Sequence, residues 1–144
     1  MSLMMCFSLS VTANARIAPP SLVQPYYEKA VETISELSIN GTTAVCTSYI
    51  KGNSEVVKIS AEQYFQKQGF LWIWSTYDGA EWTKTVYTNV LSMSNTKSGL
   101  TSGKYRLKTI FTLTDKQGKT ETITVYSDEK TVGQKCRKSL CIFV

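Results

Sequence analysis

The sequence predicts an all-β protein: a single antiparallel β-sandwich of seven strands, immunoglobulin-like and without a disulfide. Three observations support this prediction. Ser, Thr, Tyr, Val and Ile are plentiful, whereas the Ala-rich and Leu-rich runs that favour helices are scarce. Turn signals recur about every ten residues, which is the strand spacing of sandwiches and barrels. A Leu-x-x-Gly-x-Tyr stretch before the sixth strand has the pattern of a tyrosine corner.

The 144-residue chain divides into four segments by composition. Residues 1–15 contain an apolar run that ends in Ala13-Asn14-Ala15, the small-x-small pattern that signal peptidase cleaves. This run is far shorter than the roughly 20 residues of a membrane-spanning helix, and no basic residue precedes it. We expect the remnant of a signal peptide, and therefore a secreted or cell-surface protein with no transmembrane span. A proline-containing leader (16–29), the sandwich (30–130) and a basic tail (131–144) follow.

The first half of the sandwich is predicted to contain three strands. The first begins at residue 30 and ends at Asn40-Gly41, a strong two-residue signal for a type I′ hairpin turn. The second covers residues 42–50. The third, over residues 56–67, alternates apolar with charged positions, as a half-buried antiparallel strand does. One face of the second strand carries Ala44, Cys46, Ser48 and Ile50, and one face of the third carries Ile59, Ala61 and Phe65.

The second half is predicted to contain four more strands. Residues 70–76 are predicted to form a strand that is apolar on both faces, with Phe70, Trp72 and Trp74 on one face and Leu71 and Ile73 on the other. Asp78-Gly79 is predicted to turn the chain into a strand over residues 82–93. Residues 95–103 are a loop. The last two strands, over residues 104–114 and 119–127, form the clearest hairpin. Their predicted inward side chains are Tyr105, Leu107, Thr109, Phe111, Leu113, Ile123 and Val125.

Several residues are expected to stabilise this fold. Leu100, Gly103 and Tyr105 form the tyrosine-corner pattern, in which the phenol bonds back to the loop backbone. Of the four cysteines, only Cys46 belongs to the sandwich, because Cys6 lies in the signal segment and Cys136 and Cys141 lie in the tail. Cys46 is therefore expected to be a small buried hydrophobic residue without a disulfide.

Four stretches of the sandwich carry a resemblance: AVCT at residues 44–47, ISAEQYFQK at 59–67, GKYRLK at 103–108 and ETIT at 121–124. With them, residues 39–128 resemble small exported domains of unknown function from Gram-positive, gut Clostridia-type bacteria. The resemblance implies export and a β-sandwich. It supplies no catalytic residue that could be transferred to this chain.

Composition argues against most catalytic chemistry. The chain has no histidine, the commonest general base and metal ligand, and it has no P-loop, G-x-G-x-x-G or C-x-x-C motif. We therefore expect no enzymatic activity, no cofactor and no metal. A carboxylate-dependent hydrolase is the alternative, and it would need two carboxylates to converge. The net charge of +5 owes three charges to the tail, so we expect no nucleic-acid binding.

The candidate site is an aromatic cluster within residues 70–87. Phe70, Trp72, Trp74 and Tyr77 are candidates for contacting a glycan or a protein, because exposed rings stack on sugars and on apolar partner surfaces. The other interpretation is that these rings fill the core, and Trp82 is expected to do so.

Two further interactions are open. A structural protein could associate with other chains, including copies of itself, by adding strands at its sheet edges. If the apolar run over residues 3–11 is retained, we expect it to dock on a sheet edge or in an apolar groove.

Overall fold

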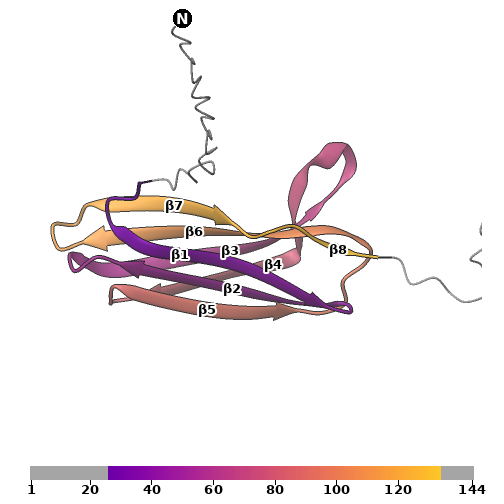
Figure 1. The fold of residues 1–144 in the computed structure, drawn as a ribbon, viewed down its shortest axis with the longest axis horizontal. Coiled ribbons are helices and arrows are strands. Elements are labelled where there is room, and N and C mark those ends of the chain that lie inside the picture. The colour runs from indigo at the N-terminus through magenta and orange to yellow at the C-terminus, as the bar shows by residue number, and fades with distance from the viewer. Residues whose placement is uncertain (1–25, 134–144) are drawn as a thin grey trace, which may run out of the picture.

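Two antiparallel sheets pack face to face in the computed structural model, which describes residues 26–133 (Figure 1). One sheet has the strand order β1-β2-β5. The other has the order β4-β3-β6-β7, and a short strand, β8, also pairs with β6. The described residues contain no α-helix and no disulfide. The predicted β-sandwich is therefore confirmed, although residues 26–133 contain eight strands where seven were predicted, because β8 adds a short strand beside β6.

The chain crosses between the sheets after β2, after β4 and after β5. Such crossings join the sheets of immunoglobulin-like sandwiches. No helix within residues 26–133 has the length and hydrophobicity needed to cross a membrane. The elements are β1 (Ala30–Asn40), β2 (Thr43–Gly52), β3 (Val56–Gln68), a 3₁₀ turn η1 (Phe70–Trp72), β4 (Trp74–Val86), β5 (Val90–Lys97), β6 (Gly103–Asp115), β7 (Thr120–Tyr126) and β8 (Lys130–Val132).

The sandwich extends beyond both of its predicted boundaries. Residues 28 and 29, assigned to the leader, contact the sandwich, and β8 extends beyond the expected boundary at residue 130. The signal segment, most of the leader, the basic tail, and Cys6, Cys136 and Cys141 lie outside the described residues.

The first hairpin forms where it was predicted, but with a different turn. Asn40 pairs with Thr43, so the two loop residues are Gly41 and Thr42. Within this loop the positive φ falls on Gly41 alone, at 62°. A single left-handed glycine at the first loop position is typical of a type II′ turn, so the type I′ prediction is wrong. The turn type differs because Asn40 pairs with Thr43, so Asn40 stays in the strand and the two-residue loop begins one residue later than predicted.

The predicted fourth and fifth strands are wrong in their boundaries. The structure has one strand, β4, that runs through Asp78-Gly79, and the crossing to the other sheet comes at residues 87–89. Tyr64 pairs with Glu81 and Gln66 pairs with Thr76, so residues 77–80 of β4 lie opposite Phe65 alone. Asp78-Gly79 therefore forms a bulge instead of a hairpin turn. The sequence motif fits both structures, because both need a residue with a left-handed backbone. The expected loop over 95–103 is also shorter, because β5 continues to Lys97.

A buried polar belt divides the core into two apolar clusters. Gln63 of β3 donates to Ser48 Oγ of β2 at 2.6 Å and accepts from Asn95 Nδ2 of β5 at 2.7 Å. Ser48 is also hydrogen-bonded to Thr109 of β6, at 2.7 Å. On one side of this belt lie Ile50, Ile59, Leu91, Phe111, Leu113 and Ile123, and on the other lie Leu37, Cys46, Phe65, Leu100, Tyr105 and Leu107. The belt thus links the two sheets through their centre.

Tyr105 makes the hydrogen bond that defines a tyrosine corner. Its ring is fully buried, and its hydroxyl donates to the backbone oxygen of Thr101 at 2.6 Å. Leu100 is buried beside it, and Gly103 begins β6. This arrangement closes one end of the sandwich.

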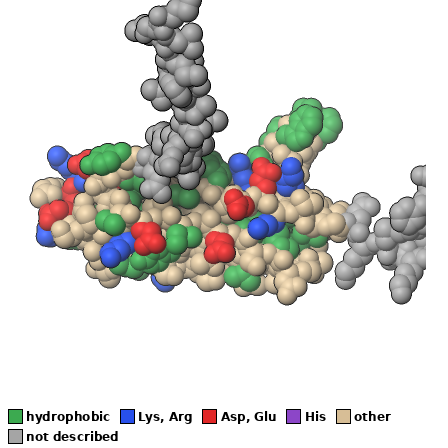
Figure 2. Space-filling model, viewed as in Figure 1, with side chains coloured by type: hydrophobic (Ala, Val, Ile, Leu, Met, Phe, Trp, Pro, Cys, Tyr) green, Lys and Arg blue, Asp and Glu red, His purple; other side chains and the backbone are tan. Residues whose placement is uncertain are grey.

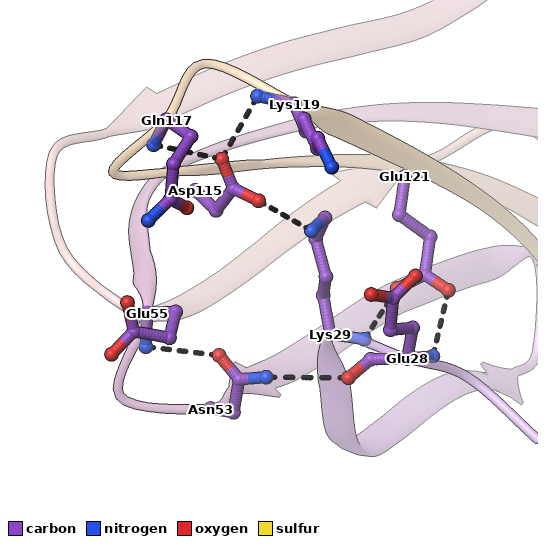
Figure 3. A network of polar contacts seen from close by, with 8 residues as sticks. All are labelled: Glu28, Lys29, Asn53, Glu55, Asp115, Gln117, Lys119 and Glu121. Carbon is purple, nitrogen blue, oxygen red and sulfur yellow. Dashed lines mark hydrogen bonds and ion pairs between the residues drawn. The ribbon is translucent and has the colours of Figure 1, made fainter.

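A polar clamp holds the start of β1 at the other end (Figure 3). The Nζ of Lys29 donates to Asp115 Oδ2 at 2.6 Å, and both side chains are buried. Asp115 Oδ1 accepts the backbone N–H groups of Gln117 and Lys119. The hydrogen bond from Lys29 lowers the pKa of Asp115, and the same bond raises the pKa of Lys29. The carboxylate of Glu121 accepts the backbone N–H groups of residues 28 and 29.

Candidate functional site

The hairpin between β3 and β4 projects from the sandwich as an arm (Figure 1). We define the arm as residues 66–76 and its tip as residues 70–73. Gln66 to Gln68 pair with Trp74 to Thr76 on the far side of the bulge, so the arm is a short two-stranded ribbon. The Gly69 N–H donates to the Ile73 oxygen at 2.8 Å and closes the loop. The bulge therefore separates the arm from the rest of β4.

All four tip side chains are large, apolar and exposed. Their exposed fractions are 87% for Phe70, 64% for Leu71, 77% for Trp72 and 63% for Ile73. Figure 2 shows this apolar surface at the end of the arm, standing clear of the sandwich. The tip is thus a convex apolar patch, made of residues that are consecutive in the chain.

The backbone of the tip is strained. Leu71 and Trp72 have φ of 56° and 58°, in the left-handed region that bulky side chains rarely adopt. Such a residue costs of order 1–3 kcal/mol, and strain of this kind clusters at functional sites. The left-handed pair makes the tight turn that directs consecutive apolar side chains into solvent.

Trp74 belongs to the root of the arm. It is partly buried, and the Arg106 guanidinium lies 4.3 Å from the centre of its ring. The same guanidinium lies 4.4 Å from the ring of Tyr126, and its Nε donates to Gln66 Oε1 at 2.8 Å. The prediction that Phe70, Trp72 and Trp74 share one face of a strand is wrong, because the first two lie in the turn.

The structure does not bring Tyr77 to the tip. This residue lies in the bulge, where its ring packs edge-on against Phe65 and Tyr105, with centroid distances of 6.0 and 5.4 Å. Its hydroxyl donates to the Gly99 oxygen at 3.4 Å. Tyr77 therefore connects the bulge to the tyrosine-corner end of the core.

The remaining predicted residues lie in or against the core. Trp82 is partly buried and packs against both apolar clusters. Cys46 is fully buried, and this burial raises the pKa of its thiol to about 12. At neutral pH Cys46 is therefore protonated and behaves as a small apolar side chain.

A carboxylate-dependent hydrolase would need converging carboxylates, and two of the surface carboxylates are engaged in ion pairs. Asp78 pairs with Lys97 at 3.1 Å, and Glu129 pairs with Lys104 at 3.3 Å. Within residues 26–133, no group of three or more Asp, Glu or Cys side chains is arranged to hold a metal ion.

Four residues of the site were not predicted from the sequence: Leu71, Ile73, Arg106 and Gln66. Leu71 and Ile73 were assigned to the opposite face of a strand from Phe70 and Trp72. The available signal was that a strand apolar on both faces does not fit a two-layer sandwich, whose outer faces meet solvent. Arg106 and Gln66 have no such signal, because their contact with Trp74 depends on strand register.

Comparisons with known proteins add little to this geometry. No protein-family model matches the chain, and a search of curated proteins finds no match. Among solved structures, catalytically inactive OgpA from Akkermansia muciniphila, in complex with the O-glycopeptide substrate glycodrosocin, is 16% identical with a TM-score of 0.37. The match covers 74% of this chain and 31% of OgpA. Similarity at this level does not bear on function.

Proposed function

We propose that this protein is a non-catalytic binding module, exported to the cell surface or beyond it, that engages its target through the arm tip. The observation that carries the proposal is the exposure of four consecutive apolar side chains at the end of a projecting arm. Large apolar patches on soluble proteins mark interaction sites more often than isolated apolar residues do.

The energetics of the tip support a role in binding. Exposed apolar surface gains roughly 25 cal/mol per Å² when it is removed from water, and Phe70 and Trp72 are the largest contributors. The root of the arm is held by the Arg106 contacts with Trp74 and Gln66. A fixed arm loses less conformational entropy on binding than a mobile one.

The chemistry of the tip supports a non-catalytic role. Phe, Leu, Trp and Ile side chains carry no acid, base or nucleophile, so the tip can bind but cannot transfer a proton or attack a bond. Export is supported by the apolar run and the Ala13-Asn14-Ala15 pattern at the start of the chain.

The proposal is tested by measuring binding of the fluorescently labelled protein to a glycan array and to intact Gram-positive cells. We expect the double substitution Phe70→Ala/Trp72→Ala to weaken binding at least tenfold without loss of thermal stability, because both side chains are exposed. The matched control is Tyr87→Ala, which removes a 79% exposed aromatic ring from the loop after β4. Binding that is equally strong with and without the tip residues would rule the proposal out.

A further inference from the structure

We infer that the target of the tip is the surface of a lipid bilayer, into whose interfacial layer residues 70–73 insert. This inference rests on the proposed function and names the partner class for the same site. Three features of the arm support it: the size of the tip, its order of polarity, and the charge at its root.

The tip is too small to form a standard protein interface alone. Such an interface takes about 20–30 residues from each partner and about 800 Å² per side. The apolar tip has four residues, and the arm holds them away from the sheets, so the rest of the molecule adds little to the same surface (Figure 2). A bilayer needs no complementary pocket, and it accommodates a small convex apolar projection.

The tip also lacks the polar groups that a glycan site needs. Sites that bind polar ligands combine apolar contact with precisely placed hydrogen-bonding groups. None of the four tip side chains carries such a group, apart from the indole N–H of Trp72. Gln66 Oε1, at the root of the arm, already accepts from Arg106.

Polarity changes along the arm in the order found at a membrane interface. The tip is wholly apolar. Gln68, Trp74 and Ser75 come next along the arm toward the sandwich. Lys67 and Arg106 lie at the root. Tryptophan is enriched at the boundary between hydrocarbon and headgroups, and basic side chains are attracted to lipid phosphates just outside it. This order predicts shallow insertion, with the tip among the headgroups and upper acyl chains.

The charge at the root is complementary to anionic lipids. Lys67 and Arg106 form no ion pair with another residue of the described range 26–133. Residues 66–76 contain no carboxylate, and the three carboxylates of β3 and β4 lie further from the tip. The carboxylates beside the root are Asp128 and Glu129, between β7 and β8, and Glu129 pairs with Lys104. Asp78 is in the bulge and pairs with Lys97, while Glu62 and Glu81 lie beyond it.

The test is co-sedimentation of the full chain with vesicles of phosphatidylcholine, with and without phosphatidylglycerol. We expect binding to both, severalfold tighter to the anionic vesicles, with the difference decreasing at high salt. Phe70→Ser/Trp72→Ser should weaken vesicle binding at least tenfold, and the matched Tyr87→Ser variant should bind as the wild type does. All variants keep residues 1–25 and 134–144, so any difference reports on the tip.

Tryptophan fluorescence locates the contact. The emission of the wild type should shift to shorter wavelength on vesicle addition and should be quenched by brominated lipid. Trp72→Phe keeps an apolar tip, so it should retain most of the binding while losing most of the shift. Vesicle binding and a fluorescence shift that both survive Phe70→Ser/Trp72→Ser would place the contact elsewhere and overturn the inference.

Absence of vesicle binding in the wild type would also overturn the inference. If array or cell binding still depended on Phe70 and Trp72, the proposed function would stand and the target would be a glycan or a protein. If neither vesicles, array nor cells bound through the tip, both proposals would fail.

Discussion

Tyr105 and Asp115 show how single polar groups close the two ends of this sandwich. The Tyr105 hydroxyl reaches back four residues to the Thr101 backbone, and Asp115 accepts from Lys29 and from two backbone N–H groups. In both cases a buried side chain forms hydrogen bonds with backbone or charged groups that have no partner in the sheets. These two contacts therefore allow direct tests of what each hydrogen bond contributes.

Tyr105→Phe should lower the free energy of unfolding by about 1 kcal/mol, the usual net value of one hydrogen bond. The ring stays in place, stacked on Phe65 at a centroid distance of 5.1 Å, so packing is preserved. Urea unfolding measures the change. Tyr87→Phe, at an exposed position, is the control and should be neutral. A Tyr105→Phe variant as stable as the wild type would show that the corner bond contributes nothing.

Asp115→Asn should destabilise the protein most at neutral pH. The pKa of Asp115 is lowered in the folded state, so its contribution is present above the unfolded pKa of about 3.9 and is lost as pH falls through the folded pKa. The difference from the wild type should therefore shrink in acid. Unfolding at a series of pH values tests this, with exposed Asp128→Asn as control. A difference that is constant with pH would contradict the prediction.

At the scale of elements, β4 connects the sandwich to the arm that carries the proposed binding site. Its bulge places four residues opposite Phe65 and makes the break between sandwich and arm. Asp78 and Gly79 both have positive φ there, at 43° and 63°. The presentation of the tip thus depends on a conformation that glycine adopts easily and other residues do not.

Gly79→Ala should cost about 1 kcal/mol of stability, since a left-handed conformation penalises residues with a Cβ by roughly 1–2 kcal/mol. No atom lies within 4 Å of the added Cβ, so the cost is conformational and not steric. The control is Gly69→Ala in the same arm. Gly69 has a φ of −101°, and a Cβ there would make only an ordinary contact at 3.7 Å. Equal stability of the two variants would argue against a strained bulge.

At the scale of the whole molecule, the polar belt joins the two sheets. In β2, β3 and β6 a buried polar residue separates an apolar residue of one cluster from an apolar residue of the other, as in Cys46, Ser48 and Ile50 of β2. Buried polar groups of this kind are costly when unpaired, so they favour the single packing of the sheets that satisfies them all.

Gln63→Leu should lower stability by about 2–3 kcal/mol, because it leaves Asn95 and the Cys46 oxygen without their partner. The double variant Gln63→Leu/Asn95→Leu should lose less than the sum of the two single losses, since both halves of one contact are removed. Denaturant unfolding of the four proteins measures this coupling. Additive losses would show that the belt is not a connected network.

The strands that could be predicted from the sequence are those with local patterns. The alternation in residues 56–67 and 104–114 depends on neighbours in the chain, and these strands lie where they were predicted. The first hairpin also lies where it was predicted, although its turn type differs. The tyrosine corner could also be predicted, because its donor, Tyr105, and its acceptor, Thr101, are only four residues apart in the chain.

Features that depend on the register between distant strands could not be predicted from the sequence. Asp78-Gly79 suits a hairpin and a bulge equally, and the pairing of β3 with β4 selects the bulge. The same pairing puts Phe70 and Trp72 in a turn and Trp74 beneath Arg106. The exposure of an apolar stretch depends on whether another layer covers it, and in a two-layer sandwich nothing in the described chain covers the tip.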